Sequence, residues 1–168
     1  MTKLERLNAL PSDQAEAELR ACCGSTRWAR EMAARRPFDD VDDMLAVAEV
    51  VWWGLGEDDW HEAFRAHPRI GERKAEAAQT ARAAAWSAQE QAGVSPGEDV
   101  KAALAEGNRA YERRFGHIYL VCASGKSAGE MLAILHARLA NAPGEELRVA
   151  AGEQAQITRL RLEKLLAG

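Results

Sequence analysis

The sequence predicts an all-α protein in which residues 1–168 form a single-domain helical bundle. Three observations favour this fold class. Alanine, the residue with the highest helix propensity, is abundant, and β-branched residues are few. Apolar residues recur at the three- and four-residue spacing of a helix with one buried face. Ser-x-x-Glu patterns, which are typical of helix N-termini, occur three times in the second half of the chain.

The first third of the chain is expected to form a short apolar turn and three helices. Asp13 and Glu16 resemble a capping box. Asp39 and Asp40 favour a helix N-terminus, because acidic side chains interact well with that end of the helix dipole. The expected segments are the turn Leu4–Leu10, then Asp13 to about Cys23, Trp28–Ala34, and the run from Asp40 to about Gly54.

A helix over Glu57–Ala66 is followed directly by His67 and Pro68. Proline disfavours the α conformation of the residue before it, so His67 is expected at a rigid junction past the helix end. Two interpretations remain open at this point. The histidine could serve the helix C-terminus, or its ring could act in a site.

Residues 73–86 are compatible with either a helix or a flap. The next pattern, from Ser87 to Glu90, predicts a helix N-terminus, and Ser95-Pro96-Gly97-Glu98 predicts another helix that continues to about Arg114. Residues 115–123 are apolar without helical period and are expected to be extended or a buried loop. Two helices follow, from Ser127 to about Asn141 and from Pro143 to about Leu166.

Charge, apolar runs and cysteine content indicate which binding partners and which cellular compartment to expect. A net charge of −4 gives no electrostatic support for binding nucleic acid or an anionic membrane. No apolar run approaches the ~20 residues of a membrane span, and the first residues do not resemble a signal peptide. Three cysteines, two of them adjacent, make a poor disulfide framework. We therefore expect a cytoplasmic protein.

Two motifs resemble known sites and fail on spacing. Gly125-Lys126-Ser127 resembles the end of a phosphate-binding loop, but Leu120 occupies the position of the required glycine. His61-Glu62 resembles the start of a zinc helix, but Arg65 stands where the second histidine would be. No metal site is predicted.

Arg161 falls on the apolar stripe of the last helix, whereas Arg159 points about 120° away. A buried arginine needs a partner, because an isolated buried charge is costly. That partner is either one of the 26 acidic residues or a bound anion or polar ring. The other members of the stripe are Leu147, Ala151, Gln154, Thr158 and Leu165.

With these residues identified, the sequence resembles the OHCU decarboxylase family, where OHCU is 2-oxo-4-hydroxy-4-carboxy-5-ureidoimidazoline, an intermediate of urate degradation. The resemblance covers nearly the whole chain and rests on the order and spacing of short elements. These are Cys22-Cys23-Gly24-Ser25 with Trp28, Arg36-Pro37-Phe38, His67-Pro68-Arg69-Ile70-Gly71, Ser87-x-x-Glu90-Gln91, Arg114-Phe115-Gly116, Arg138-Leu139-x-Asn141 and Glu153-x-x-x-Ile157-x-x-x-Arg161-Leu162.

The resemblance implies an all-helical, cofactor-free homodimer that converts OHCU to (S)-allantoin and CO2. It places the catalytic roles on His67, Glu90 and Arg161. It also implies substrate contacts from two further segments, which comprise Pro68, Ser87, Gln91, Tyr119, Val121, Cys122 and Ala123. An alternative of a different class is a helical binding module that recognises a ureido compound without catalysis.

We expect the decarboxylation implied by the resemblance to survive exhaustive chelation, because the spacing of histidine, cysteine and acidic residues provides no metal site. The measurement is turnover before and after dialysis against EDTA. Loss of activity that a divalent metal restores would contradict the expectation.

Overall fold

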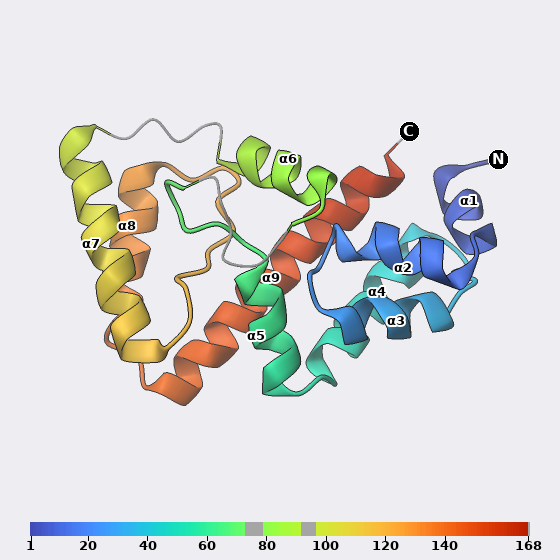
Figure 1. The fold of residues 1–168 in the computed structure, drawn as a ribbon, viewed down its shortest axis with the longest axis horizontal. Coiled ribbons are helices and arrows are strands. Elements are labelled where there is room, and N and C mark those ends of the chain that lie inside the picture. The colour runs from blue at the N-terminus through green and yellow to red at the C-terminus, as the bar shows by residue number, and fades with distance from the viewer. Residues whose placement is uncertain (73–78, 92–96, 168) are drawn as a thin grey trace. The chain divides into compact units, whose positions relative to one another are not determined.

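The computed structural model describes residues 1–72, 79–91 and 97–167. These residues form nine helices and contain no strand, which confirms the all-α fold class (Figure 1). The chain divides into two compact units, residues 1–63 with 155–168, and residues 64–154. The last helix contributes to both units. That residues 1–168 form one domain stays a prediction.

The first unit is built on three successive helices that pack against one another. Helix α2 (Ser12–Arg20) packs on α3 (Thr26–Ala34), and α3 packs on α4 (Val41–Trp53). The unit also contains α1 (Lys3–Ala9) and most of α5 (Glu57–Arg65). Its largest fully buried side chains are Leu7, Leu19, Trp28, Met32, Met44 and Leu162.

Three helices of this unit, α1, α3 and α4, begin after a short polar side chain that caps them. The Ser25 hydroxyl accepts from the Trp28 N–H, and the Asp40 carboxylate accepts from the Asp43 N–H, as expected for that helix. The expected capping box at Asp13 and Glu16 is wrong. Helix α2 begins directly after Pro11, whose side chain has no acceptor for a cap.

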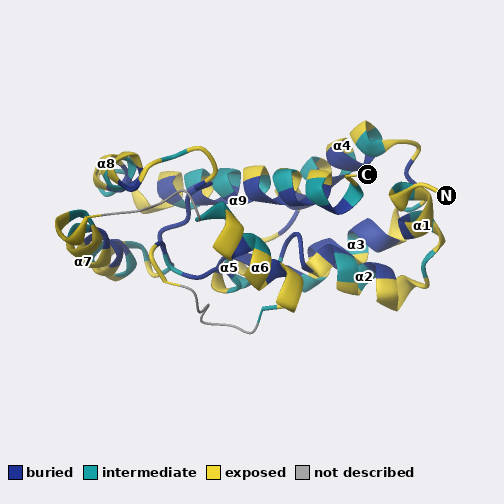
Figure 2. Cartoon of the chain, turned by 90° about the horizontal axis from the view of Figure 1, so that it is seen from above, coloured by how far each residue is buried: buried dark blue, intermediate teal, exposed yellow. Residues whose placement is uncertain are grey.

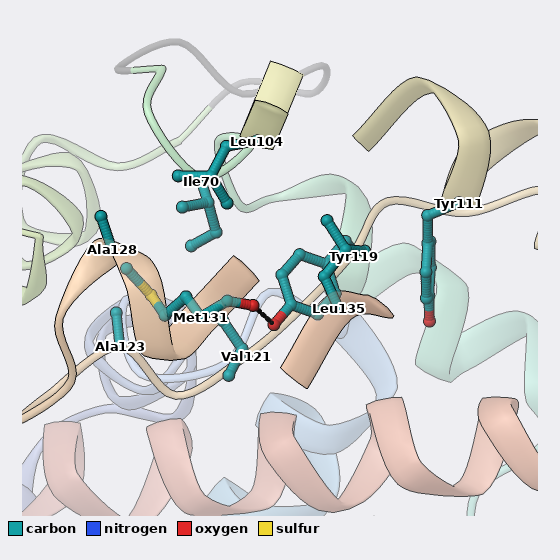
Figure 3. Close-up of a cluster of buried hydrophobic side chains, with 9 residues drawn as sticks. All are labelled: Ile70, Leu104, Tyr111, Tyr119, Val121, Ala123, Ala128, Met131 and Leu135. Atoms are coloured by element: carbon teal, nitrogen blue, oxygen red, sulfur yellow. Dashed lines mark hydrogen bonds between the residues drawn. The ribbon is translucent and has the colours of Figure 1, made fainter. Parts of the chain in front are cut away.

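The second unit contains α6 (Ala81–Glu90), α7 (Glu98–Phe115), α8 (Ala128–Arg138) and the first part of α9 (Pro143–Leu166). Helices α7 and α8 lie side by side (Figure 1). A Cβ at Gly107 would lie 2.3 Å from Leu135 Cδ2, so glycine permits their close approach. A cluster of buried apolar side chains fills the space between these elements (Figure 3).

The predicted helix start at Ser87 is wrong. Helix α6 begins after Thr80, whose hydroxyl accepts from the Ala83 N–H at 3.0 Å. Ser87 and Glu90 therefore lie in the last turn of a helix. The alanine-rich run after Thr80 has high helix propensity, so a cap at its start excludes a second start within it. Of the segment left open between helix and flap, residues 81–86 are helical, and residues 73–78 lie outside the described residues.

The later helices follow the sequence more closely. The Ser127 hydroxyl accepts from the Glu130 N–H, as expected, and α9 spans the predicted range. Helix α7 starts after Gly97 without a side-chain cap, while the predicted Ser95 and Pro96 lie outside the described residues. Residues 116–127 are not helical, and residues 118–123 are buried.

No helix among the described residues combines the length and the apolar character needed to cross a membrane.

A buried ion pair joins the end of α8 to the start of α9. Arg138 Nη2 lies 2.5 Å from Glu146 Oε2, and their side chains are 7% and 0% exposed. Arg138 Nη1 also donates to the Leu120 carbonyl at 2.7 Å, and the Tyr111 hydroxyl donates to Glu146. Four elements of the second unit therefore meet at one pair of charges.

We expect Arg138→Leu to destabilise the protein by about 3–5 kcal/mol, because it leaves the Glu146 carboxylate buried without its cation. Urea denaturation measures the effect. The matched control is Arg109→Leu, since Arg109 pairs with Glu106 at the surface, and that pair is expected to contribute at most about 1 kcal/mol. Equal losses in both variants would contradict the importance of the buried pair.

Candidate active site

His67 lies two residues beyond the end of α5, at Arg65, and is buried, with 5% of its surface exposed. Its N–H donates to the Phe64 carbonyl, and Pro68 after it is also buried. The ring reaches α9, where its Nε2 lies 2.7 Å from Gln154 Oε1. This contact links residues 87 positions apart, so the ring takes part in tertiary structure and not only in ending α5.

The loop that follows His67 is fixed by side chains from two helices. Arg69 makes two hydrogen bonds to the Glu112 carboxylate of α7, at 2.8 and 2.7 Å. Asn108, also on α7, donates to the Ile70 carbonyl at 3.2 Å. Such bidentate and buried contacts fix a loop in one conformation, so the backbone that carries His67 is held rigidly.

The end of α6 supplies a further anchor to this loop. The Gly71 N–H donates to Gln91 Oε1 at 3.0 Å, and Gly71 has a φ of +91°, a conformation that favours glycine. Ser87 is buried and accepts from Gln79 Nε2, while Glu90 and Gln91 are half-buried. The structure therefore places the Ser87–Gln91 segment beside the histidine loop.

The expected apolar wall, residues 119–123, contributes mainly to the core. Tyr119, Val121 and Ala123 pack into the buried cluster, and the Tyr119 hydroxyl donates to the Met131 carbonyl at 2.8 Å (Figure 3). Alternate residues of an extended chain point to opposite sides. If this segment contacts a substrate, the contact therefore comes from its main chain or from Cys122. The assignment of these residues to a binding site stays a prediction.

Cys122 shows that the segment and α6 share one environment. Burial raises the pKa of the Cys122 thiol, and the negative charges of Glu153 and Glu90 raise it further. The Cys122 N–H lies 3.4 Å from Glu153 Oε1 on α9. A raised pKa disfavours the thiolate, the nucleophilic form of cysteine, so Cys122 is poorly suited to nucleophilic attack.

Arg161 lies in the first unit, whereas His67 and Glu90 lie in the second. It is 3% exposed, and its Nη1 donates to the Ala21 carbonyl at 3.3 Å. Burial raises the pKa of the neighbouring Cys23 to about 12, while the charge of Arg161 acts in the opposite direction. The predicted stripe is confirmed in most of its members, since Ala151, Gln154, Thr158 and Leu165 are buried, whereas Leu147 is half-buried; Arg159 is exposed. Figure 2 shows the alternation of buried with half-buried and exposed positions along α9.

Sequence reasoning did not assign a site role to Gln154, Asn108 or Glu112. The signal for Gln154 was present, because a polar residue on the buried stripe of α9 requires a partner. Asn108 and Glu112 had no comparable signal, since both are ordinary polar residues of a long helix. Among the described residues, no three His, Cys, Asp or Glu side chains could hold a metal ion.

The fold and these contacts define an all-α protein with a buried histidine on a fixed loop, beside carboxylate and amide side chains. The family model for OHCU decarboxylase matches residues 8–163, and the chain belongs to this family.

Individual relatives agree with this assignment. The chain is 36% identical over 153 residues to the uric acid degradation bifunctional protein TTL of Arabidopsis thaliana, covering 90% of this chain and 47% of that protein. It is thus about half as long as this relative. It is 31% identical to a putative OHCU decarboxylase of Homo sapiens over 79% of this chain and 77% of that protein.

Solved structures show the same fold. A crystal structure of OHCU decarboxylase in the presence of (S)-allantoin matches with a TM-score of 0.77 and 34% identity, covering 90% of this chain and 98% of that one. A structure of (S)-allantoin synthase matches with a TM-score of 0.75 at 16% identity, over 99% of this chain and 54% of that one, which supports the fold alone.

The corrected position of Glu90 gives a stability prediction. Glu90→Gln should change the free energy of unfolding by less than about 0.5 kcal/mol, because Glu90 lies half-buried in the last turn of α6 and does not complete a capping box. Thr80→Ala removes the actual cap and should cost about 0.5–2 kcal/mol. Urea denaturation of both variants measures the difference. A larger loss for Glu90→Gln than for Thr80→Ala would contradict the placement.

Proposed function

We propose that this protein catalyses the cofactor-independent decarboxylation of OHCU to (S)-allantoin and CO2. The observation that carries the proposal is His67, buried on a loop fixed by α6 and α7, the residue to which the sequence resemblance assigns the catalytic histidine. The similarity to an OHCU decarboxylase solved in the presence of (S)-allantoin gives further support.

The substrate itself explains how the reaction proceeds without a cofactor. Loss of CO2 leaves an electron pair on the carbon that held the carboxylate. That carbon bears a hydroxyl and adjoins a ring C=N bond, which accepts the electron pair. The protein is then required only to bind, to orient and to move protons.

His67 is the proposed acid–base group. It takes the proton of the substrate hydroxyl or returns a proton during the reaction, and an ordinary imidazole serves either role near neutral pH. The fixed backbone of the loop keeps the ring at one position, which lowers the entropic cost of bringing it into the reactive geometry.

Glu90 and Arg161 are proposed to orient the substrate. The Glu90 carboxylate accepts hydrogen bonds from the ureido or ring N–H groups and so selects the face that is protonated. Arg161 binds carbonyl or carboxylate oxygens through its planar guanidinium. Orientation is favoured over tight binding of the carboxylate, since a tight grip would stabilise the ground state. Pro68, Ser87 and Gln91 line the substrate, together with the main chain of Tyr119, Val121 and Ala123 and with Cys122.

Two further parts of the proposal rest on the sequence. The family resemblance supports assembly as a homodimer, and the cysteine content, a poor disulfide framework, supports action in the cytoplasm. Light scattering of the purified protein tests the first, and fractionation of cells that express it tests the second.

The competing function is a binding module for a ureido compound, in which the same residues recognise without catalysing. Turnover separates the two. Freshly generated OHCU is incubated with the protein, and the optical activity of the allantoin is followed beside the spontaneous reaction. An enzyme yields one enantiomer faster than the background, whereas a binding module leaves the background unchanged.

We expect His67→Ala to lower kcat/KM by about 10²–10⁴-fold, the contribution of a positioned acid–base group. The protein should remain folded, as measured by circular dichroism. His136→Ala on the exposed face of α8 is the matched control and should retain full activity. Wild-type turnover in His67→Ala would exclude the proposed role.

A further inference from the structure

Gln154 is hydrogen-bonded to the His67 ring. It is fully buried, and its Oε1 lies 2.7 Å from His67 Nε2. Both residues belong to the second unit. A buried hydrogen bond of this length is a defined interaction, because neither group can exchange it for bulk water without cost.

The atoms in contact specify which ring nitrogen carries the proton. The Gln154 amide faces the ring with its oxygen, and a carbonyl oxygen only accepts, so this orientation requires that Nε2 is the donor and bears hydrogen. In the neutral imidazole the other nitrogen, Nδ1, then holds the lone pair. We propose that Gln154 is a positioning residue that fixes this tautomer of His67, and that Nδ1 is the nitrogen through which His67 exchanges a proton with the substrate.

The catalytic part of this inference rests on the proposed function. When His67 acts as a base, the O–H bond of the substrate hydroxyl breaks and an N–H bond forms at Nδ1. When His67 acts as an acid, the same N–H bond breaks and the proton returns. In both directions the Nε2–H bond to Gln154 remains in place.

An amide suits this role for a physical reason. Glutamine neither titrates nor carries charge near neutral pH, so it orients the ring without the strong stabilisation that a carboxylate gives to an imidazolium. A carboxylate at the same position would favour the charged ring and shift the working range to higher pH.

The fold supports the contact from both sides. Gln154 lies on the buried stripe of α9 between Ala151 and Thr158, so packing restricts its rotamers. On the other side, Pro68 restricts the backbone of His67, and the Arg69–Glu112 contact fixes the loop. Neither partner can turn away freely.

The test compares Gln154→Met with Gln154→Glu. Methionine has a similar length and lacks the accepting oxygen, whereas glutamate retains an acceptor. We expect kcat for OHCU to fall about 10–100-fold in Gln154→Met, the rate equivalent of a lost hydrogen bond with a partner left unpaired. Gln154→Glu should recover part of kcat and move the acid limb of the pH profile upward by about 1–3 pH units. The matched control is Gln156→Met on the exposed face of α9, which should be unaffected.

Nitrogen NMR of the imidazole ring gives a readout that does not depend on activity. The wild type is expected to show a protonated Nε2 and an unprotonated Nδ1 for His67, and Gln154→Met a mixture of tautomers. A wild-type protein with protonated Nδ1 would overturn the inference, as would unchanged tautomer and kcat in Gln154→Met. If the wild type lacks turnover, the proposed function fails, and the spectrum still decides whether Gln154 sets the tautomer.

Discussion

The arrangement of the second unit depends on the buried ion pair between Arg138 and Glu146. Arg138 ends α8 and donates to the Leu120 carbonyl, so it fixes the extended segment as well as the helix. Its guanidinium also lies over the Tyr119 ring, 4.9 Å from the ring centroid. Glu146 opens α9, the helix that carries Gln154 two turns further on. A pair of charges in the core is stable only when every partner is in place, so this contact favours one arrangement of these elements.

The same rule, that buried polar groups need partners, explains the environment of His67. The ring bonds to Gln154, the Ile70 carbonyl bonds to Asn108, and the Gly71 N–H bonds to Gln91. Each contact satisfies a polar group and also restricts the loop. The hydrogen bonds that stabilise this part of the fold are thus the same ones that orient His67, the proposed base.

Local signals predicted the helices well, since the spacing of apolar residues and caps such as Ser127 act within a few residues. They failed at Ser87, where the pattern of a capping box lies inside a helix that Thr80 had already begun. Local signals do not predict contacts between residues that lie far apart in the chain. Nothing near His67 in the sequence indicates Gln154, and Tyr119 was expected to contact substrate although its side chain packs in the core. The family resemblance supplied the combination of His67, Glu90 and Arg161, which the spacing alone would not have joined.

The central proposal, which rests on the family resemblance, is that His67, Glu90 and Arg161 act on one small molecule. A crystal structure of the protein with bound (S)-allantoin tests it most directly, because the product shows which side chains reach the reacting atoms. We expect hydrogen bonds from allantoin to His67 and to Glu90, and a hydrogen bond from the Arg161 guanidinium to a carbonyl oxygen of allantoin. Allantoin bound out of reach of His67, or bound without any contact to the Arg161 guanidinium, would contradict it.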